Sequence, residues 1–369
     1  MAKFYHPFKG GMETVLKLLS EGLRGLGHEV TCLVANSSRR TVKEHVDGVR
    51  VVRAASFGVV RSVSVSPTFF SAFRALVREA DIIHIHEQNP LADLAALVAP
   101  RTVPLVVTCH SAIVRQRLGR IIWQPVLVRV QRHAHRVIVT SPPMTHTVVA
   151  TAARPPAVIP FGIDLSTIEA PDGARAAGSD EPLLLSVGRL VGYKGLEYLI
   201  AALADVPDAR LVLVGNGPLQ SRLHEQAVAR HVENRVEFAG EVSDTRLAAL
   251  YRRCTVFVLP SVSPAEAFGM VQLEAMAYGK PVVSTALPTG VPWVNRDGET
   301  GLIVPPRSPQ ALAQALNTLL ASPALRQRMG AAGRRRVHET FTAEHMVRCY
   351  AGIYAQAVSA VGAPAAKNQ

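Results

Sequence analysis

Cysteine is scarce in this sequence and widely scattered. The four cysteines, Cys32, Cys109, Cys254 and Cys349, form no Cys-x-x-Cys pair. Disulfide frameworks and cysteine zinc sites depend on closely spaced cysteines, so neither is indicated. A run of about 18 apolar residues and a signal peptide are also lacking, so we expect a chain that is neither membrane-spanning nor secreted. The expectation is a cytoplasmic protein with reduced thiols, and peripheral contact with the inner face of a membrane stays open.

Acidic residues are outnumbered, and the imbalance lies in the first half. Residues 1–165 hold 20 Lys and Arg against 10 Asp and Glu, a net charge of +10, while residues 166–369 hold 20 against 18, a net charge of +2. A basic first half predicts an acidic partner such as lipid head groups, a diphosphate-linked acceptor or nucleic acid. Aromatic residues are only 5% of the chain and do not interleave these charges, which argues against stacking on single-stranded nucleic acid.

The chain is long enough for two domains. Its 369 residues exceed what one core usually holds, and 48% of them are hydrophobic. Short β-branched runs alternate with helical segments, which is typical of a parallel sheet with helices on both faces. A stretch rich in Ala, Gly, Asp and Pro at 166–182 predicts an exposed linker. The predicted strands of the first half cover residues 29–34, 49–53, 82–86, 105–108, 137–140 and 158–159.

The N-terminus lacks an obvious first strand. A turn-like segment leads directly to Gly10, Gly11 and a predicted helix over residues 12–25. In open α/β sheets a glycine-rich turn normally follows the central first strand, and its glycines let the backbone approach a phosphate. Either the chain lacks this strand or its start has been placed too late. Gly10 and Gly11 are nevertheless candidate phosphate-binding residues.

The segment 260–281 combines two carboxylates with the start of a helix. Glu266 lies in a loop after a predicted strand, and Glu274 lies about one and a half turns into a helix predicted over 268–279. Free amides at a helix start, with the helix dipole behind them, suit an anion such as phosphate. The amides expected there are those of Phe268, Gly269, Met270 and Val271.

Two cations follow a predicted strand over residues 183–187. Arg189 and Lys194 stand five positions apart in a loop that contains glycine. Arg can take two phosphate oxygens in a fork while Lys acts as a point charge, so the pair suits a diphosphate. The chain contains no Asp-x-Asp, so a metal ion that bridges a diphosphate is not indicated.

Histidines lie at the ends of two predicted strands in the first half. His84 and His86 lie in the strand over 82–86, and His110 follows the strand over 105–108. Such sheets bind ligands at the carboxyl ends of their strands, so His110 is a candidate ligand-binding residue. We interpret His84 and His86 as ordinary structural histidines, because their spacing does not support a metal site. We likewise interpret the run 334–336, Arg-Arg-Arg, as a solvated helix end.

Several motifs together resemble the retaining glycosyltransferases of family 4. They are Glu266-Ala-Phe-Gly-(x)4-Glu-Ala-Met-Ala-x-Gly-Lys-Pro, Gly188-Arg-(x)4-Lys-Gly, Val107-Thr-Cys-His-Ser, Pro160-Phe-Gly-Ile-Asp and Lys3-Phe-Tyr-(x)3-Lys-Gly-Gly-Met-Glu. The resemblance covers residues 3 to about 355. It implies an α/β fold of the GT-B architecture, with two facing Rossmann-like domains of parallel sheets, here with the first strand of the N-terminal domain missing.

The resemblance also implies how the chain is divided. We expect an N-terminal acceptor-binding domain over 1–164 and a C-terminal nucleotide-sugar-binding domain over 165–342. A terminal helix over 343–360 would pack back on the N-terminal domain, and residues 361–369 would form a disordered tail.

Residue roles are carried over from the same resemblance. His110 is expected to bond a hydroxyl of the donor sugar, Glu266 to bind further sugar hydroxyls, and Glu274 to accept hydrogen bonds from the ribose. The residues implied in catalysis are His110, Arg189, Lys194 and Glu266. The residues implied in donor binding are Gly10, Gly11, Arg189, Lys194, Gly215, Val236, Phe238, Phe268, Gly269, Met270, Val271 and Glu274.

Within the family the motifs look most like those of bacterial polysaccharide and O-antigen mannosyltransferases. We therefore expect transfer of a hexose, best assigned as mannose from GDP-mannose, to a lipid-linked or glycan acceptor, with retention and without a metal or cofactor. The alternatives are a nucleotide-sugar epimerase or another GT-B enzyme, and a basic nucleic-acid-binding protein, for which the sequence offers no binding motif.

The segment 114–136 leaves two interpretations open. Arg115, Arg117 and Arg120 stand among apolar residues near Trp123, a composition typical of a helix in a membrane interface. Pro125 interrupts this helix, however, and a solvated basic face over a buried apolar one explains the pattern equally well.

Overall fold

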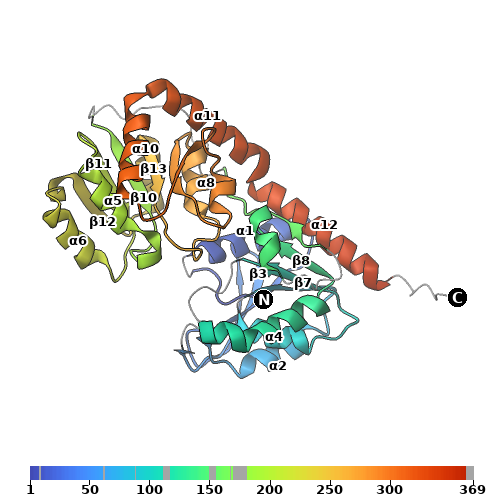
Figure 1. Ribbon diagram of the computed structural model, residues 1–369. Coiled ribbons are helices and arrows are strands. Elements are labelled where there is room, and N and C mark those ends of the chain that lie inside the picture. Colours follow the sequence, from blue (N-terminus) through green and yellow to red (C-terminus); the bar gives the residue numbers. More distant parts are fainter. Residues whose placement is uncertain are drawn as a thin grey trace. The chain divides into compact units, whose positions relative to one another are not determined.

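The chain divides into two compact units. The computed structural model describes residues 1–7, 10–60, 63–87, 89–110, 117–148, 155–166, 168 and 181–362. Unit 1 comprises Met1–Gly162 and the C-terminal segment that begins at Ala343, and unit 2 comprises Ile163–Thr342 (Figure 1). Most of the expected linker over 166–182 lies outside the described residues, as do residues 363–369 of the expected tail. Among the described helices, none is long and apolar enough to cross a membrane.

Unit 2 is built on a six-stranded parallel sheet. Its strands are β10 Leu183–Val187, β11 Arg210–Val214, β12 Val236–Gly240, β13 Val256–Leu259, β14 Val282–Thr285 and β15 Gly301–Val304. They lie in the order β12-β11-β10-β13-β14-β15. This is the dinucleotide-binding order 3-2-1-4-5-6, in which the chain starts centrally and changes direction once. The point of that change, between β10 and β13, is where such sheets bind ligands.

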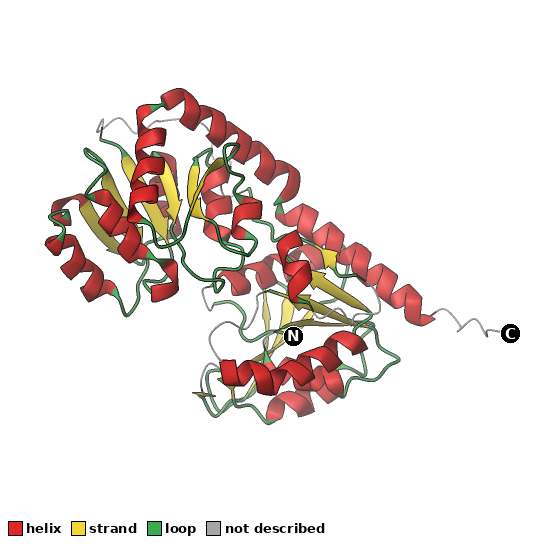
Figure 2. Cartoon of the chain, viewed as in Figure 1, coloured by secondary structure: helices red, strands yellow, loops and turns green. Residues whose placement is uncertain are grey.

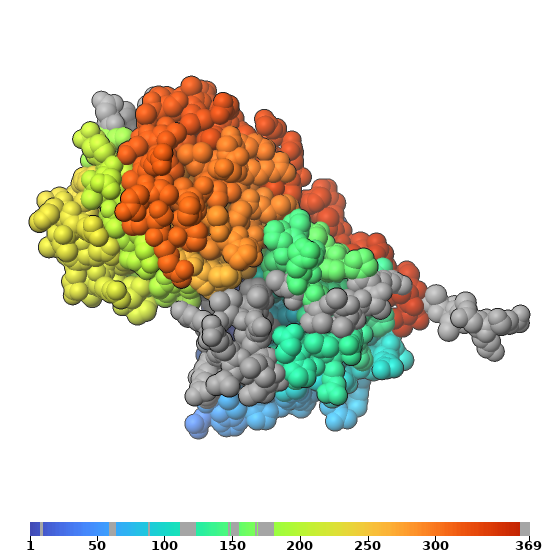
Figure 3. Space-filling model, in the orientation of Figure 1, coloured from blue at the N-terminus to red at the C-terminus, as the bar shows by residue number. Residues whose placement is uncertain are grey.

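Helices cover both faces of this sheet, as Figure 2 shows. They are α5 Leu196–Leu203, α6 Gln220–Ala229, α7 Asp244–Arg253, α8 Met270–Ala277, α9 Val291–Val294, α10 Pro309–Ala321 and α11 Pro323–Thr340. In the space-filling view α10 and α11, in orange, form much of the visible surface of the unit (Figure 3). Both begin at a Ser-Pro pair, where Ser308 and Ser322 cap the first turn and proline is tolerated at the first helical position.

Unit 1 contains two main sheets and a short hairpin. One sheet has the order β1-β3-β2, with β1 and β3 parallel and β2 antiparallel, and the other has the parallel order β6-β7-β8-β9. The strands are β1 Thr31–Ala35, β2 Val42–Val46, β3 Val49–Ala54, β6 Ile83–His86, β7 Leu105–Cys109, β8 Arg136–Val139 and β9 Ala157–Val158, with the hairpin β4 Val59–Val60 and β5 Val63–Ser64.

The first three residues lie between these two sheets. The backbone of Met1 forms hydrogen bonds of 2.6 and 3.1 Å with β6. On their other side Ala2 and Lys3 bond to β1, each at 3.3 Å. Residues 1–3 are not assigned as a strand, yet they occupy the central place that the sequence analysis described as empty.

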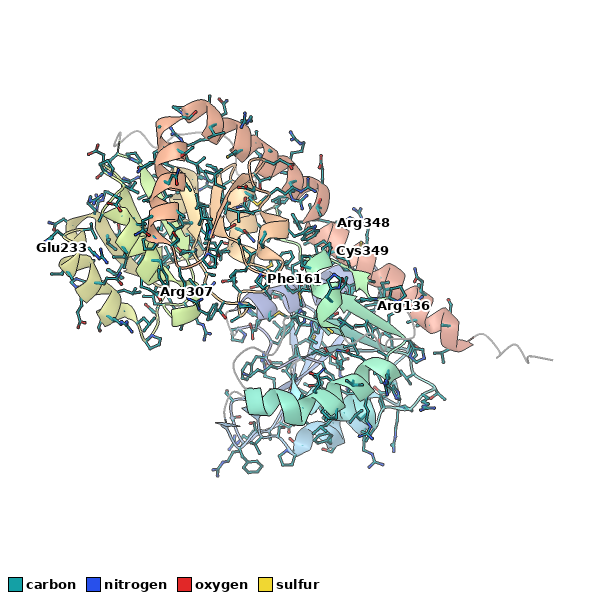
Figure 4. All side chains as sticks on the ribbon, viewed as in Figure 1. Arg136, Phe161, Glu233, Arg307, Arg348 and Cys349 are labelled. Atoms are coloured by element: carbon teal, nitrogen blue, oxygen red, sulfur yellow. The ribbon has the colours of Figure 1, made fainter. Side chains whose placement is uncertain are left out.

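The terminal helix α12, Ala343–Gly362, belongs to unit 1 and extends two residues beyond the expected end. It packs on α1, Gly11–Gly25, where a Cβ on Gly22 would lie 2.4 Å from Val347. Its Gln356 accepts a hydrogen bond of 3.2 Å from Arg136, which is labelled in Figure 4. The other helices of unit 1 are α2 Thr68–Leu76, α3 Pro90–Leu97 and α4 Arg117–His133.

Candidate functional site

The direction change in unit 2 gathers the two predicted diphosphate-binding cations. β10 and β13 are neighbours and parallel, so the loops that follow them meet at one edge of the sheet. A shallow depression, called the hollow below, lies at this edge. Its lining includes Gly188, Arg189, Lys194, Val214, Leu259 and Pro260.

Two glycines allow the loop after β10 to fold tightly over the sheet edge. Gly195 has a φ of 65°, and a Cβ there would lie 2.2 Å from the carbonyl oxygen of Pro260. Gly188 has a φ of 147°, and its absent Cβ leaves room for the side chain of Lys194. Side chains larger than glycine would therefore push Lys194 away from the strand end.

Lys194 forms a buried ion pair with Glu266. Its Nζ lies 2.6 Å from Oε2 of Glu266, and each side chain is only 11% exposed. Burial lowers the pKa of Lys194, but the attraction of Glu266 and smaller contributions from Tyr193 and the hydrogen bond outweigh burial, so the pKa is raised. Ser261 also donates to Oε2 of Glu266, at 2.9 Å. The lysine is therefore held fully charged.

Arg189 is the second cation at this edge. Its side chain is exposed and lines the same hollow as Lys194. The charge of Arg189 lowers the pKa of Lys194, but by less than the charge of Glu266 raises it. The hollow thus combines one fixed cation and one cation that solvent can reach, a combination that suits a dianionic group.

The start of α8 contacts Leu259, one of the residues that line the hollow, but no residue of α8 lines the hollow itself. Gly269 caps this helix with a φ of 74°, and a Cβ on it would lie 2.6 Å from Leu259, one of the lining residues. For the amides of Gly269, Met270 and Val271 we find no backbone acceptor in the described ranges. The side chain of Phe268 is buried and packs on the rings of Trp293 and Phe341, at 6.3 and 6.0 Å between centroids. That packing fixes the helix start.

Glu274 projects from the middle of α8 and is held by a tyrosine. Tyr251 donates its hydroxyl to Oε2 of Glu274 over 2.7 Å. Burial raises the pKa of Glu274, and the bond from Tyr251 partly offsets this. Tyr251 itself stacks on Tyr278, with centroids 5.5 Å apart and planes 10° from parallel.

Of the residues predicted to line the base, Gly215 follows β11 and Phe238 lies in the middle of β12. Val236 is the first residue of β12 and so lies at the amino end of that strand, on the opposite edge of the parallel sheet. Gly215 directly follows β11, and its amide donates to Gly240 at the end of β12 over 2.7 Å. Val236 and Phe238 are half-buried in β12, and the ring of Phe238 lies 5.8 Å from that of His224. These residues therefore lie at or near the outer strands of the sheet, while Lys194 lies at its centre.

Unit 1 holds the remaining predicted site residues. His110 follows β7, is buried, and stacks on Phe161, which Figure 4 labels, with ring centroids 5.4 Å apart. Its Nε2 lies 2.6 Å from Nδ1 of His86. Burial lowers the pKa of His110 to about 3, so its ring is neutral at pH 7. Gly10 caps α1 and Gly11 is its first residue.

Four residues of the described structure have contacts that were not predicted from the sequence. Ser261 and Tyr251 bond to the predicted glutamates, but a lone Ser in a loop and a lone Tyr in a helix carry no signal of such a role. The contact of His86 with His110 was not predicted, although it is compatible with the interpretation of His86 as a structural histidine. In the run 334–336 the expectation of a solvated helix end is wrong for Arg336, which is buried and donates to the carbonyl oxygen of Trp293 at 2.8 Å.

Two family models match the chain and together span most of it. One, described as glycosyl transferases group 1, matches residues 170–336, and the other, described as Glycosyltransferase Family 4, matches residues 9–167. The boundary between the two matches, near residue 168, falls within six residues of the boundary between the two units.

Characterised relatives match over nearly their full length. The D-rhamnosyltransferase WbpZ of Pseudomonas aeruginosa is 35% identical over 340 residues, which cover 90% of this chain and 89% of that protein. The O-antigen chain mannosyltransferase C of Escherichia coli is 30% identical over 95% of this chain and 96% of its own. The phosphatidyl-myo-inositol mannosyltransferase of Mycobacterium leprae is 30% identical over 92% of each chain.

Solved structures share the fold. Sucrose-phosphate synthase from Thermosynechococcus elongatus superposes with a TM-score of 0.82 at 28% identity, covering 95% of this chain and 94% of that one. Anabaena HepE, solved in complex with UDP, superposes with a TM-score of 0.77 at 22% identity, covering 96% of this chain and 99% of that one.

Proposed function

We propose that this chain, which belongs to glycosyltransferase family 4, transfers a hexose of the manno configuration from a GDP-sugar to a glycan or lipid-linked acceptor. The chain is a hexosyltransferase, and its two units of parallel sheets have the GT-B architecture. One observation carries most of the proposal. Arg189 and Lys194 line one hollow at the point where a dinucleotide-type sheet changes direction, and the start of α8 contacts Leu259, another lining residue.

The sugar is inferred from the relatives. Two of them are named mannosyltransferases and one a D-rhamnosyltransferase. D-Rhamnose is 6-deoxymannose, so all three names share one ring configuration. We therefore assign mannose, or a sugar that differs from it at C6, as the group transferred, and GDP as the nucleotide.

Electrostatics support the roles of the two cations. When the bond from the anomeric carbon to the phosphate breaks, negative charge develops on the diphosphate. Lys194 is held charged and in place by Glu266, and Arg189 adds a second positive charge at the rim. The free amides at the start of α8 supply the positive end of a helix dipole. We propose that these groups neutralise the leaving group without a metal ion, in keeping with the lack of Asp-x-Asp in the sequence.

The reaction we assign retains configuration through displacement on one face of the sugar. The acceptor hydroxyl oxygen bonds to the anomeric carbon as the bond to the phosphate oxygen breaks. The proton of that hydroxyl passes to the departing phosphate oxygen. Glu266 does not attack in this scheme: its Oε2 is occupied by Lys194 and Ser261, and Oε1 is assigned to a hydroxyl of the donor sugar.

The nucleoside is assigned to the outer part of the same sheet edge. We propose that Glu274, oriented by Tyr251, accepts hydrogen bonds from the ribose. Gly215 and the half-buried Phe238 are assigned to the base, whereas Val236, at the amino end of β12, is not. Gly10 and Gly11, at the start of α1 in unit 1, are assigned to the donor phosphates, because a helix start without Cβ atoms lets backbone amides approach them.

The acceptor is assigned to unit 1. Residues 1–165 carry a net charge of +10, which favours an acceptor linked to diphosphate or phospholipid. One relative is named for phosphatidyl-myo-inositol, which is such a lipid. We therefore propose a role in cell-surface polysaccharide synthesis, with the protein held peripherally at the inner face of the membrane.

Donor choice can be tested directly. The melting temperature of the protein should rise in the presence of GDP-mannose or GDP-rhamnose in buffer that contains EDTA, because a ligand that binds only the folded state stabilises it. UDP- and ADP-sugars serve as matched controls. Product analysis with and without a membrane extract as the acceptor source then separates transfer from hydrolysis or epimerisation. A shift with UDP-glucose and none with GDP-sugars would overturn the assignment of donor.

A further inference from the structure

Three histidines and two tyrosines form a cluster near the end of β7 in unit 1, in which His86, His110 and Tyr350 are buried and His84 and Tyr354 are half-buried. His84 and His86 alternate along β6 and therefore share one face of the sheet with His110. The ring centroids of His84 and His86 are 4.4 Å apart, and those of His86 and His110 are 4.8 Å apart with planes 9° from parallel. Only His110 has been assigned a role so far.

Each of the three imidazoles is neutral at physiological pH. Burial lowers the pKa of His110 to about 3 and lowers those of His84 and His86 well below their ordinary value. A neutral imidazole has one N–H donor and one acceptor nitrogen. In the 2.6 Å contact between Nδ1 of His86 and Nε2 of His110, one ring must therefore donate and the other accept.

Which ring donates decides which of the two rings carries an N–H on its second nitrogen, the one outside the His86–His110 contact. Within the described part of the chain, neither Nε2 of His86 nor Nδ1 of His110 has a hydrogen-bond partner, and both atoms are buried. If His110 donates, the unpaired N–H is on His86, the last residue of β6. If His86 donates, the unpaired N–H is on His110, beyond the end of β7. A buried N–H without a partner costs more free energy than an unpaired acceptor nitrogen. The favoured arrangement is therefore the one in which the unpaired N–H is on His110, where a ligand can accept its hydrogen bond.

His84 holds His86 against rotation. Nε2 of His84 lies 2.7 Å from the hydroxyl of Thr108, and its Nδ1 lies 2.7 Å from the hydroxyl of Tyr354 on α12. The Thr108 hydroxyl in turn lies 3.2 Å from that of Tyr350, also on α12. Both nitrogens of His84 are thus occupied, and its fixed ring packs against His86.

We propose that His86 is a positioning residue that donates from Nδ1 to Nε2 of His110 and so fixes His110 in the tautomer with its N–H on Nδ1. Since His110 follows the carboxyl end of β7, the end of a parallel strand at which such sheets bind ligands, that N–H is assigned as a donor to an oxygen of the transferred sugar. His84 and the α12 tyrosine Tyr354 keep His86 in place. The assignment of a sugar as the ligand rests on the proposed function, whereas the assignment of the tautomer does not.

The tautomer can be measured on the whole protein by ¹⁵N NMR of imidazole-labelled histidine. The His110 signals are identified by their loss in His110→Gln. In the unsubstituted protein we expect Nδ1 of His110 to be protonated and Nε2 to be unprotonated. The opposite assignment would overturn the proposal even if sugar transfer is found, and an absence of transfer with every nucleotide sugar would overturn the proposed function while leaving the tautomer result intact.

Substitutions at His86 separate positioning from packing. In His86→Asn the side-chain amide nitrogen takes the place of Nδ1 and still donates, whereas His86→Leu fills the space without a donor. We expect His86→Leu to shift the His110 tautomer and to lower kcat about tenfold or more, the effect of one lost hydrogen bond, with little change in the donor KM. His86→Asn should recover most of kcat. Equal kcat for the two folded variants would contradict a role for the donated proton.

Two further variants complete the test. His45→Asn makes the same chemical change at an exposed position of β2 in the same unit, and it should leave kcat and the His110 signals unchanged. Tyr354→Phe frees one nitrogen of His84, and it should broaden the His86 and His110 signals without reversing the tautomer. If His86→Leu fails to fold, His86→Asn and Tyr354→Phe still report the tautomer, and a reversed tautomer in His86→Asn would overturn the proposal.

Discussion

Lys194 and Glu266 stand 72 positions apart in the sequence, yet their side chains form a buried contact of 2.6 Å. The lysine comes from the loop after β10 and the glutamate from the loop after β13. In a nucleotide sugar the phosphate is bonded to the anomeric carbon of the sugar ring, and the sugar hydroxyls are on the neighbouring carbons of the same ring. The contact between Lys194 and Glu266 is therefore compatible with the roles that we propose for them, Lys194 with the phosphate and Glu266 with the sugar hydroxyls of one donor molecule.

Replacement of Lys194 with Ala should lower turnover by about 10²- to 10³-fold, because one fixed charge on the leaving group is lost. The variant should remain folded, since Glu266 keeps its bond from Ser261. Lys280→Ala is the matched control in the same unit: Lys280 bonds only the carbonyl oxygen of Arg252 among its described contacts, so turnover should be retained. Near-normal turnover of folded Lys194→Ala would remove this residue from the mechanism.

Replacement of Glu274 with Gln should weaken donor binding, with a donor KM about tenfold higher. Gln keeps the size of the side chain and one acceptor oxygen but loses the charge that strengthens bonds to ribose hydroxyls. Tyr251→Phe should give a smaller rise, because the carboxylate remains but loses its fixed orientation. Steady-state kinetics with varied donor measure both effects. An unchanged KM in Glu274→Gln would exclude contact with the ribose.

Strand β10 was predicted with the bounds that the structure shows, because residues 183–187 form a short apolar run, whereas the order of the strands in the unit 2 sheet was not predicted. The position of α8 was also predicted closely, since Gly269 and Gly279 flank it in the sequence. The edge strand β2 was missed, because its mostly polar and exposed residues show none of the apolar character of a central strand.

The partners within the site were not readable in the same way. Whether Tyr251 faces Glu274, or His86 faces His110, depends on the rotation of each strand or helix about its own axis. Sequence spacing fixes that rotation only relative to neighbours in the same element. Arg336 illustrates the same limit: its neighbours Arg334 and Arg335 are exposed as expected, while Arg336 itself faces inward.

The pH dependence of stability should reveal the buried acid Asp93. Burial raises the pKa of Asp93 to about 7, with a hydrogen bond from Trp123 opposing and the charge of Glu87 adding to the shift. The folded-state pKa lies above the unfolded value, so this contribution to stability is present below about pH 4 and is lost as pH rises to about 7.

Asp93→Asn removes that dependence and keeps an acceptor for Trp123. The free energy of unfolding of the unsubstituted protein should therefore fall relative to that of Asp93→Asn between about pH 4 and pH 7. Denaturant titrations at several pH values measure the difference. A difference that does not change with pH would contradict the raised pKa.

Membrane contact should depend on Arg115, Arg117 and Arg120. The first lies outside the described residues, as do the side chains of the other two, so the prediction rests on the sequence alone. Reversal of all three charges to Glu should weaken binding to anionic vesicles about tenfold or more, because each basic residue near such a surface contributes to binding. Triple reversal at the exposed Arg307, Arg334 and Arg335 of unit 2 is the control. Equal vesicle binding by both variants would favour the solvated-face interpretation.

We propose that the diphosphate is bound by Arg189, Lys194 and the start of α8 without a metal ion. The affinity of the protein for GDP in the presence of EDTA, measured by calorimetry, tests this directly. We expect GDP to bind without metal. The double variant Arg189→Ala, Lys194→Ala should bind GDP about a hundredfold or more weakly, because the charge-assisted bonds to the diphosphate are lost. GDP that binds only when Mg²⁺ or Mn²⁺ is added, or that binds the double variant as tightly as the unsubstituted protein, would contradict the proposal.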